Sequence, residues 1–180
     1  MRITRENTVG LIIDIQEKLF PAMANSVDVL KHSKNLIEGL QVLNIPLLFT
    51  QQYTKGLGET VEPIRSLIPN FKAFEKHDFS CCDESTITEK LKLKGARYVI
   101  LCGMESHICV LQTAIDLQET GYVPVVVMDC VASRTQESVK WAAERLRHEG
   151  IMMTSAEAVL FELTRSSAAP EFRTISKIIK

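Results

Sequence analysis

The sequence predicts an α/β fold, a three-layer α/β/α sandwich around a mostly parallel, six-stranded, Rossmann-like sheet with strand order 3-2-1-4-5-6. Short apolar runs typical of buried strands alternate with stretches whose apolar residues recur at helical spacing. Asn44, Gly121 and Gly150 follow the helical stretches, where a helix is expected to end. Strands connected by helices in this way form parallel sheets that are covered on both faces.

The expected strands are the apolar runs, taken in chain order. They cover residues 9–14, 46–50, 73–75, 98–103, 123–129 and 151–154. The helices between them are expected from apolar residues on one face: Val27, Leu30, Ile37 and Leu40, then Ile108, Leu111 and Ile115, then Val139, Ala142 and Leu146. Residues 51–83 break the rhythm and predict a loop excursion with a short helix at 61–67, and such excursions are commonly functional. The tail, residues 170–180, is expected to form one final helix.

Composition limits the partners and the compartment. A chain of 180 residues suits one domain, residues 1–180, and its net charge of -1 creates no field that gathers nucleic acid or anionic lipid. A small-molecule substrate is therefore expected. The first apolar run is too short for a signal-peptide core or a membrane span. Five cysteines without regular disulfide spacing indicate a reduced, cytoplasmic protein.

Candidate site residues end the predicted strands. Ligands of such sheets bind outside the carboxyl ends of the strands, where the strand order reverses. Asp14 ends the first strand, Lys76 follows the third, Gly103 ends the fourth and Asp129 ends the fifth. We expect all four at one edge, with Asp14 beside the turn that follows Gly103.

That turn carries a candidate nucleophile. Ser106 is the expected N-cap of the next helix, which places Cys109 in the first helical turn. Free backbone N–H groups and the helix dipole favour a thiolate there, and a nearby Lys76 would favour it further. Asp14 could accept the thiol proton, and backbone N–H groups of the turn could hold an oxyanion.

Each of these residues also has a plainer interpretation. A cysteine on an apolar helix is usually a packing residue, Asp14 could cap a helix, and Lys76 taken alone is more often a surface charge. Two functions of other classes therefore stay open. One is a catalytically silent binding or scaffold protein, and the other is a redox-sensing thiol protein.

The sequence predicts neither a cofactor nor a metal. No Gly-rich phosphate loop follows the first strand, which disfavours a nucleotide cofactor. The adjacent Cys81 and Cys82 lack the spacing of zinc ligands. His107 lies two residues from Cys109, so on a helix the two side chains point in different directions and form a poor dyad.

Three motifs, in order, resemble those of the isochorismatase-like cysteine hydrolase superfamily over nearly the whole chain. They are Asp14-Ile-Gln16, Glu75-Lys76-His-Asp-Phe-Ser80 and Gly103-Met-Glu-Ser-His-Ile-Cys109. Within the superfamily, residues 49–58 and 170–173 are most similar to the isochorismatase domain-containing proteins. The resemblance implies that Asp14 is the base, Lys76 its electrostatic partner and Cys109 the nucleophile.

The same resemblance implies a cis peptide bond between Met104 and Glu105. The backbone N–H groups of this turn, including that of Cys109, would then face the substrate oxygen. It also implies a homo-oligomer, a dimer or a tetramer. Nicotinamidases in the superfamily bind a metal through an Asp-x-His pair after the second strand, where this chain has Gln51, Gln52 and Tyr53. Members that cleave a vinyl ether often lack the cysteine, so its presence argues against that reaction.

We therefore predict hydrolysis of an amide-like C–N bond in a small molecule through a thioester intermediate on Cys109. The side chains expected to bind the substrate are Gln16, Phe20, Gln52, Tyr53 and Phe79.

Glu105 is unusual beside an oxyanion turn. Facing inward it would repel anionic substrates, and facing outward it would be available to a neighbouring subunit.

Overall fold

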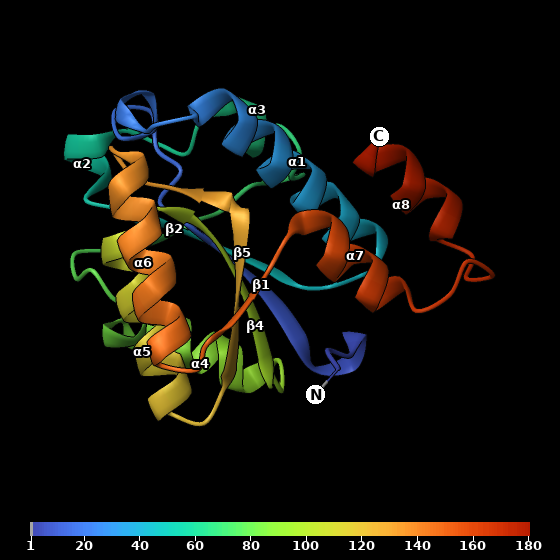
Figure 1. The fold of residues 1–180 in the computed structure, drawn as a ribbon. Helices are drawn as coiled ribbons and strands as arrows, with labels where there is room; N and C mark the ends of the chain where they lie inside the picture. The colour runs from blue at the N-terminus through green and yellow to red at the C-terminus, as the bar shows by residue number, and fades with distance from the viewer. Residues whose placement is uncertain (1) are drawn as a thin grey trace.

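The computed structural model describes residues 2–180 and has a six-stranded parallel sheet between two layers of helices (Figure 1). The strands are β1 (Thr8–Ile13), β2 (Leu47–Gln52), β3 (Phe74–Lys76), β4 (Tyr98–Met104), β5 (Val123–Ala132) and β6 (Met152–Thr154). Their order is β3-β2-β1-β4-β5-β6 and neighbouring strands pair in parallel. The predicted α/β/α sandwich and strand order are confirmed.

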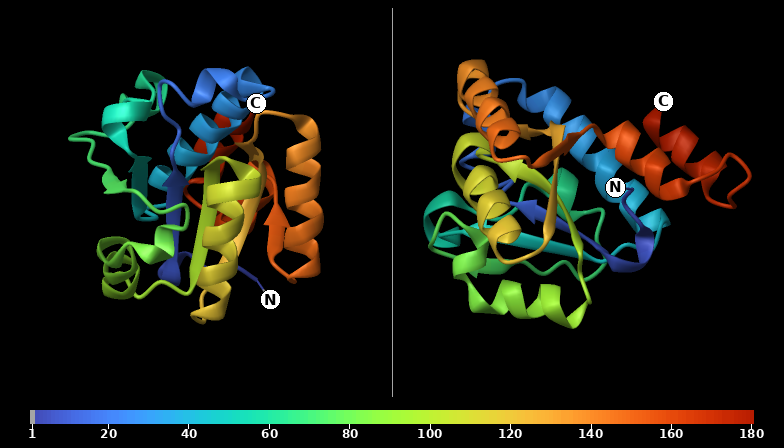
Figure 2. Two further views of the ribbon diagram at one scale, coloured as in Figure 1. Left: turned by 90° about the vertical axis from the view of Figure 1, so that its left-hand side faces the viewer. Right: turned by 60° about the horizontal axis from the view of Figure 1, so that its bottom comes forward.

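Helices lie on both sides of the sheet, as the two views of Figure 2 show. One layer holds α1 (Ser26–Val42), α7 (Ala156–Thr164) and α8 (Phe172–Ile179), and the other holds α4 (Ser85–Leu93), α5 (Leu111–Glu119) and α6 (Gln136–His148). The short helices α2 (Thr54–Leu57) and α3 (Glu62–Arg65) lie between β2 and β3. Asn44, Gly121 and Gly150 have positive φ at the helix ends where the sequence predicts them.

Two buried faces differ from the prediction. Val27 is 79% exposed, and α1 instead buries Val29, Ser33, Leu36, Ile37, Gly39 and Leu40. Residues 106–110 form a π-helical turn before α5, and this wider turn shifts the phase of the helix that follows. The fully buried positions are therefore Val110, Ala114 and Leu117, while Ile108, Leu111 and Ile115 are only half-buried.

The apolar residues of α7 pack into the protein's own core. Val159, Leu160 and Leu163 are fully buried in the cluster that also contains residues of α1 and α8. The apolar stretch 156–163 is therefore used mainly inside the protein's own core. Within residues 2–180, the longest apolar helical stretch falls short of what a bilayer crossing requires.

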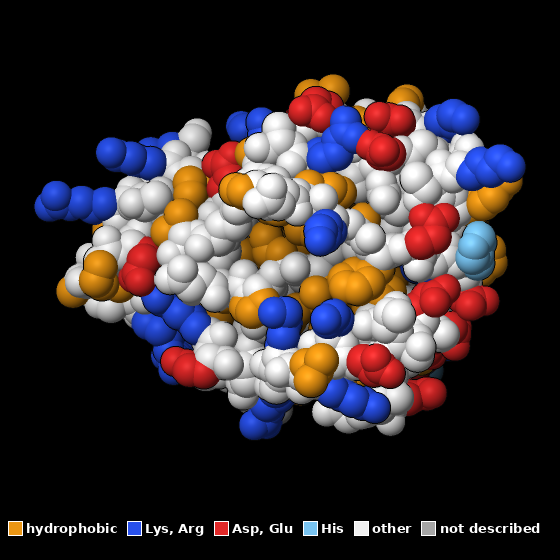
Figure 3. All heavy atoms as spheres, turned by 180° about the vertical axis from the view of Figure 1, so that it is seen from behind, with side chains coloured by type: hydrophobic (Ala, Val, Ile, Leu, Met, Phe, Trp, Pro, Cys, Tyr) orange, Lys and Arg blue, Asp and Glu red, His pale blue; other side chains and the backbone are white. Residues whose placement is uncertain are grey.

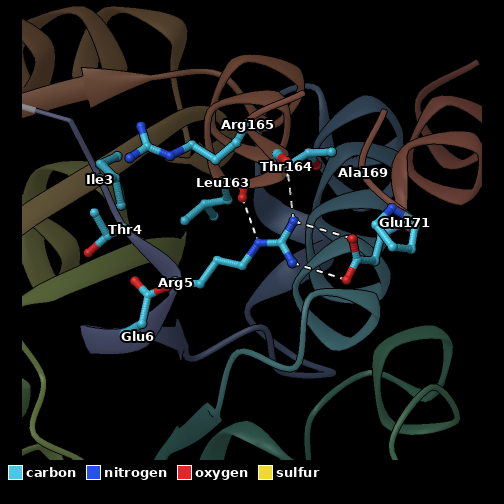
Figure 4. A pocket seen from close by; sticks show the side chains of 10 residues that line it. Ile3, Thr4, Arg5, Glu6, Leu163, Thr164, Arg165, Ala169 and Glu171 are labelled. Atoms are coloured by element: carbon cyan, nitrogen blue, oxygen red, sulfur yellow. Dashed lines mark hydrogen bonds and ion pairs between the residues drawn. The ribbon is translucent and has the colours of Figure 1, made fainter. Parts of the chain in front are cut away.

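Arg5 joins the N-terminal segment to the C-terminal helices (Figure 4). Its Nε donates to the carbonyl oxygen of Leu163 at 2.6 Å, and Nη2 donates to that of Thr164 at 3.3 Å, so it caps the end of α7. Its guanidinium also forms a two-pronged ion pair with Glu171, ahead of α8. These groups border a cavity of about 360 Å³. The cavity lies at the amino end of β1, whereas Asp14 follows the carboxyl end of the same strand.

We expect Arg5→Ala to lower the free energy of unfolding by about 1–3 kcal/mol, because it leaves the carbonyl groups of the buried Leu163 and Thr164, and the carboxylate of Glu171, without their donor. Arg5→Lys is the matched control and should retain part of this stability, since an ammonium cannot form the two-pronged contact. Urea denaturation of the three proteins measures the difference. An unchanged midpoint for Arg5→Ala would contradict the prediction.

Candidate active site

The acid of the predicted site lies where β1 and β4 come closest. Asp14 directly follows β1, is fully buried and has a left-handed φ of 50°, which aspartate tolerates better than most residues. Gly103 in β4 pairs with Ile13, and a Cβ on Gly103 would lie 1.9 Å from the carbonyl oxygen of Ile13. Glycine therefore allows the turn after β4 to approach Asp14.

Asp14 and Lys76 form a buried ion pair. The Nζ of Lys76 lies 2.7 Å from Oδ2 of Asp14, and both side chains are fully buried. Thr50 of β2 donates its hydroxyl to Oδ1 of Asp14 at 2.7 Å. Thr50 is not among the residues that the sequence predicts for the site, although a polar residue near the end of an apolar strand is a weak signal for such a role.

Lys76 is enclosed by acceptors. Besides Asp14, its Nζ donates to Oε1 of Gln52 at 3.1 Å and to the carbonyl oxygens of Asp78 and Phe79 at 3.0 and 3.3 Å. An ammonium has three N–H donors, so the bonds to Gln52, Asp78 and Phe79 use its whole donor capacity, and its contact with Asp14 is an ion pair. Lys76 thus holds Asp14 and the loop after β3 rather than presenting a free charge at the surface.

Cys109 completes the group. It lies in the π-helical turn, is 5% exposed, and its Sγ donates to Oε1 of Gln52 at 3.4 Å. Besides its burial, the charges of Lys76 and Asp14 both act on this thiol, the first lowering and the second raising its pKa. An acid, an amine and a thiol from distant parts of the chain therefore meet at the carboxyl edge of the sheet.

The thiol is protonated at neutral pH, which differs from the thiolate that the sequence predicts. Burial raises the pKa of Cys109 to about 11. The charge of Lys76 lowers this pKa, but the neighbouring charge of Asp14 raises it and offsets part of that effect. The sequence predicts that a cation lies beside the sulfur. It does not show how strongly burial raises the pKa of the thiol, and this rise is larger than the lowering by the cation.

Burial also acts on the ion pair. It raises the pKa of Asp14 above its ordinary value, although Lys76 and Thr50 lower it. For Lys76, burial lowers the pKa, but the charge of Asp14 outweighs this and the net pKa lies above the ordinary value. A carboxylate whose pKa is moved toward neutrality suits proton transfer better than an ordinary one.

The turn that carries Cys109 is held from the end of β5. The Met104–Glu105 peptide bond is cis, and Met104 is fully buried. The carboxylate of Glu105 is paired with Arg134, which donates from Nε at 3.0 Å and from Nη2 at 3.2 Å. The negative charge of Glu105 is thus neutralised within the chain, by a partner that the sequence analysis missed.

Ser106 is not the predicted helix cap. The turn begins after Glu105 with no side-chain cap, because the hydroxyl of Ser106 instead contacts that of Ser133 at 2.5 Å. His107 Nδ1 contacts the same Ser133 hydroxyl at 2.9 Å. Ser106 and His107 therefore bind the segment after β5.

The expected substrate-binding residues divide into three groups. Gln16 is fully buried and hydrogen-bonds the backbone of Gln52 and Gly58, so it ties loops together and differs from the prediction. Phe20 is half-buried against the core on the α1 face, whereas Cys109 belongs to the core on the other face. Tyr53 and Phe79 are about half exposed, and Gln52 contacts the thiol.

Asp129 lies away from this group, contrary to the prediction. It sits inside β5, which continues to Ala132 past an irregularity in its pairing with β4. Its Oδ1 accepts from the backbone N–H of Ala156 at 2.9 Å and its Oδ2 lies 3.7 Å from Nδ1 of His32. Asp129 thus holds the start of α7.

Among the described residues, 2–180, no cluster of three or more His, Cys, Asp or Glu side chains could hold a metal ion.

Comparison with known proteins decides the family, because residues 8–158 match the isochorismatase domain. The chain belongs to the isochorismatase family. Isochorismatase domain-containing protein 2 of Danio rerio is 34% identical over 178 residues, 99% of this chain and 89% of its own length. The secreted isochorismatase effector Isc1 of Phytophthora sojae is 36% identical over 186 residues, which span 99% of this chain and 87% of that protein.

Among solved structures, the MAR1 ribonuclease from Caenorhabditis elegans is similar with a TM-score of 0.93 and 34% identity, covering 99% of this chain and 92% of that one. The resemblance stated from the motifs is thereby confirmed, and the protein is hydrolase-like in kind. Within the isochorismatase domain, Thr50 and Arg134 add polar contacts to the motif residues.

Proposed function

We propose that this isochorismatase-family protein hydrolyses an amide-like C–N bond of a small molecule, with Cys109 as nucleophile and Asp14 as proton carrier. The observation that carries the proposal is the gathering of the three groups: Oε1 of Gln52 accepts from Cys109 Sγ at 3.4 Å and from Lys76 Nζ at 3.1 Å, and Lys76 Nζ lies 2.7 Å from Oδ2 of Asp14. An inert scaffold has no need to bury a lysine, an aspartate and a thiol together, since burying charges is costly.

The chemistry proceeds in two halves. Cys109 Sγ attacks the substrate carbonyl carbon while the thiol proton moves to Asp14, and the C–N bond breaks as the leaving nitrogen takes that proton. Water then attacks the thioester, giving its proton to Asp14, and the departing sulfur recovers it as the acid product leaves. The backbone N–H groups of residues 105–109 are the proposed donors to the oxyanion.

A second candidate is hydrolysis of RNA, because the similar C. elegans protein is named MAR1 ribonuclease. Asp14 would then activate an attacking hydroxyl group, and the thiol would be dispensable. Electrostatics argues against it: the net charge is -1, and on the face seen in Figure 3 basic and acidic side chains are interspersed around an apolar hollow. RNA binding depends largely on clustered Lys and Arg.

Intact mass measurement after acid quench, on a panel of amides and esters, tests the first candidate. We expect an acyl adduct on the wild type and on Cys82→Ala, a control that removes a half-buried thiol, but none on Cys109→Ala. Hydrolysis that persists in Cys109→Ala would contradict the proposal. Equal cleavage of a labelled oligoribonucleotide by wild type and Cys109→Ala would instead support the second candidate.

We also propose that the protein works in a reducing, cytoplasmic compartment. The five cysteines are all free, which is consistent with a reducing, cytoplasmic location. We also propose a homo-oligomer, whose copy number sedimentation or light scattering would measure directly.

A further inference from the structure

The geometry points to Gln52 as a positioning residue, whose side-chain oxygen holds the Cys109 thiol and Lys76 in a fixed relation. This inference rests on the proposed hydrolysis and replaces the substrate-binding role that the sequence suggests for Gln52. Its Oε1 accepts from Cys109 Sγ at 3.4 Å and from Lys76 Nζ at 3.1 Å. One oxygen atom therefore touches both the proposed nucleophile and the cation beside it.

The orientation of the Gln52 amide is determined by its neighbours. Its Nε2 donates to the carbonyl oxygen of His77 at 3.0 Å, a contact that the oxygen end of the amide could not form. An ammonium likewise cannot donate to an NH₂ group, so Lys76 requires the oxygen end. These opposite demands keep Oε1 directed at Lys76 and Cys109.

The backbone at Gln52 is held equally firmly by Gln16. The N–H of Gln52 donates to Oε1 of Gln16 at 2.7 Å, and Nε2 of Gln16 donates to the carbonyl oxygen of Gln52 at 3.0 Å. Gln16 is fully buried, so this reciprocal pair is shielded from water. The side chain of Gln52 thus extends from a clamped position at the end of β2.

The chemical consequence concerns the thiol proton. Gln52 accepts from the sulfur at 3.4 Å, and the charge of Asp14 raises the pKa of the thiol. Of the two groups only the carboxylate can take the proton, because a neutral amide oxygen is far too weak a base. Gln52 therefore fixes where the sulfur sits without taking part in proton transfer. Losing its oxygen would free the thiol to rotate and would remove one acceptor from Lys76.

Two variants separate these contributions. Gln52→Glu adds a carboxylate beside the sulfur, so the alkylation curve of Cys109 should move to higher pH, and labelling at neutral pH should slow about tenfold for every pH unit that the curve moves. Gln52→Met keeps the length but has no oxygen acceptor. We expect it to lower kcat by about 10–100-fold with little change in KM, because misplacing a reacting group impairs the chemical step.

The experiment follows iodoacetamide labelling of Cys109 by peptide mass spectrometry, from neutral pH to about 11, the pKa of the wild-type thiol. Gln51→Glu and Gln51→Met are the matched controls, because Gln51 is the preceding residue of β2 and its side chain points to the other face of the sheet. They should label like the wild type. Circular dichroism confirms folding, and the nearly isosteric Gln52→Glu carries the test should Gln52→Met fail to fold.

Labelling curves for the Gln52 variants that coincide with those of the Gln51 controls would overturn the inference. A rise in KM with kcat unchanged would also overturn it, since that result indicates a substrate contact. Labelling requires no substrate, so failure of the proposed hydrolysis is recognised separately: no acyl adduct would form in the wild type, whatever the labelling curves show.

Discussion

Replacing Lys76 by methionine is expected to lower the free energy of unfolding by about 3–5 kcal/mol, the largest stability effect of any single change at the site. The variant leaves the carboxylate of Asp14 fully buried without a counter-charge, and it removes the donor from the carbonyl groups of Asp78 and Phe79. Urea denaturation at neutral pH measures the loss.

A double-mutant cycle shows whether the loss comes from the pair. Asp14→Asn combined with Lys76→Met removes both charges, so it should be more stable than Lys76→Met alone, with a clear coupling energy between the two positions. Lys92→Met on the surface of α4 is a control for the change of side chain and should be nearly neutral. A Lys76→Met protein as stable as the wild type would show that the ion pair is not a structural requirement.

Asp14→Asn is expected to change hydrolysis and thiol reactivity in opposite directions. Loss of the proton carrier should reduce kcat/KM by about 10²–10⁴-fold. The charge of Asp14 raises the pKa of Cys109 in the wild type, so removing it should lower that pKa from about 11. More thiolate then exists at neutral pH, and iodoacetamide labelling of Cys109 should become faster.

Asp78→Asn is the matched control, because Asp78 contacts Lys76 through its backbone carbonyl and its side chain is exposed. It should leave both hydrolysis and labelling close to wild type. A parallel fall of both activities in Asp14→Asn would indicate a collapsed site and contradict the assigned role.

The sheet could be predicted from the sequence because a buried parallel strand needs an uninterrupted apolar run, and the runs around Ile12 and Ile100 leave little alternative. The site residues could be expected because they follow such runs. Asp129 shows the limit of this reasoning: the apolar run stops there, but β5 continues to Ala132 through an irregularity that no local pattern encodes.

Partners that depend on three-dimensional proximity could not be predicted. Thr50 and Arg134 lie outside the three motifs that carry Asp14, Lys76 and Cys109, and each acquires its role by facing a charge from another strand end. The protonation state of Cys109 was predicted wrongly because spacing along the chain shows which charges are near, but not how much water is excluded.

The missing side chain at Gly103 has a consequence for how this family can diversify. Because β1 and β4 touch backbone to backbone there, the two strand ends that lead to Asp14 and to the turn of Cys109 are joined inside the sheet rather than by the surrounding loops. Segments such as 53–73 can then accept insertions or new side chains and change what enters the site. The distance over which a proton must travel would stay the same.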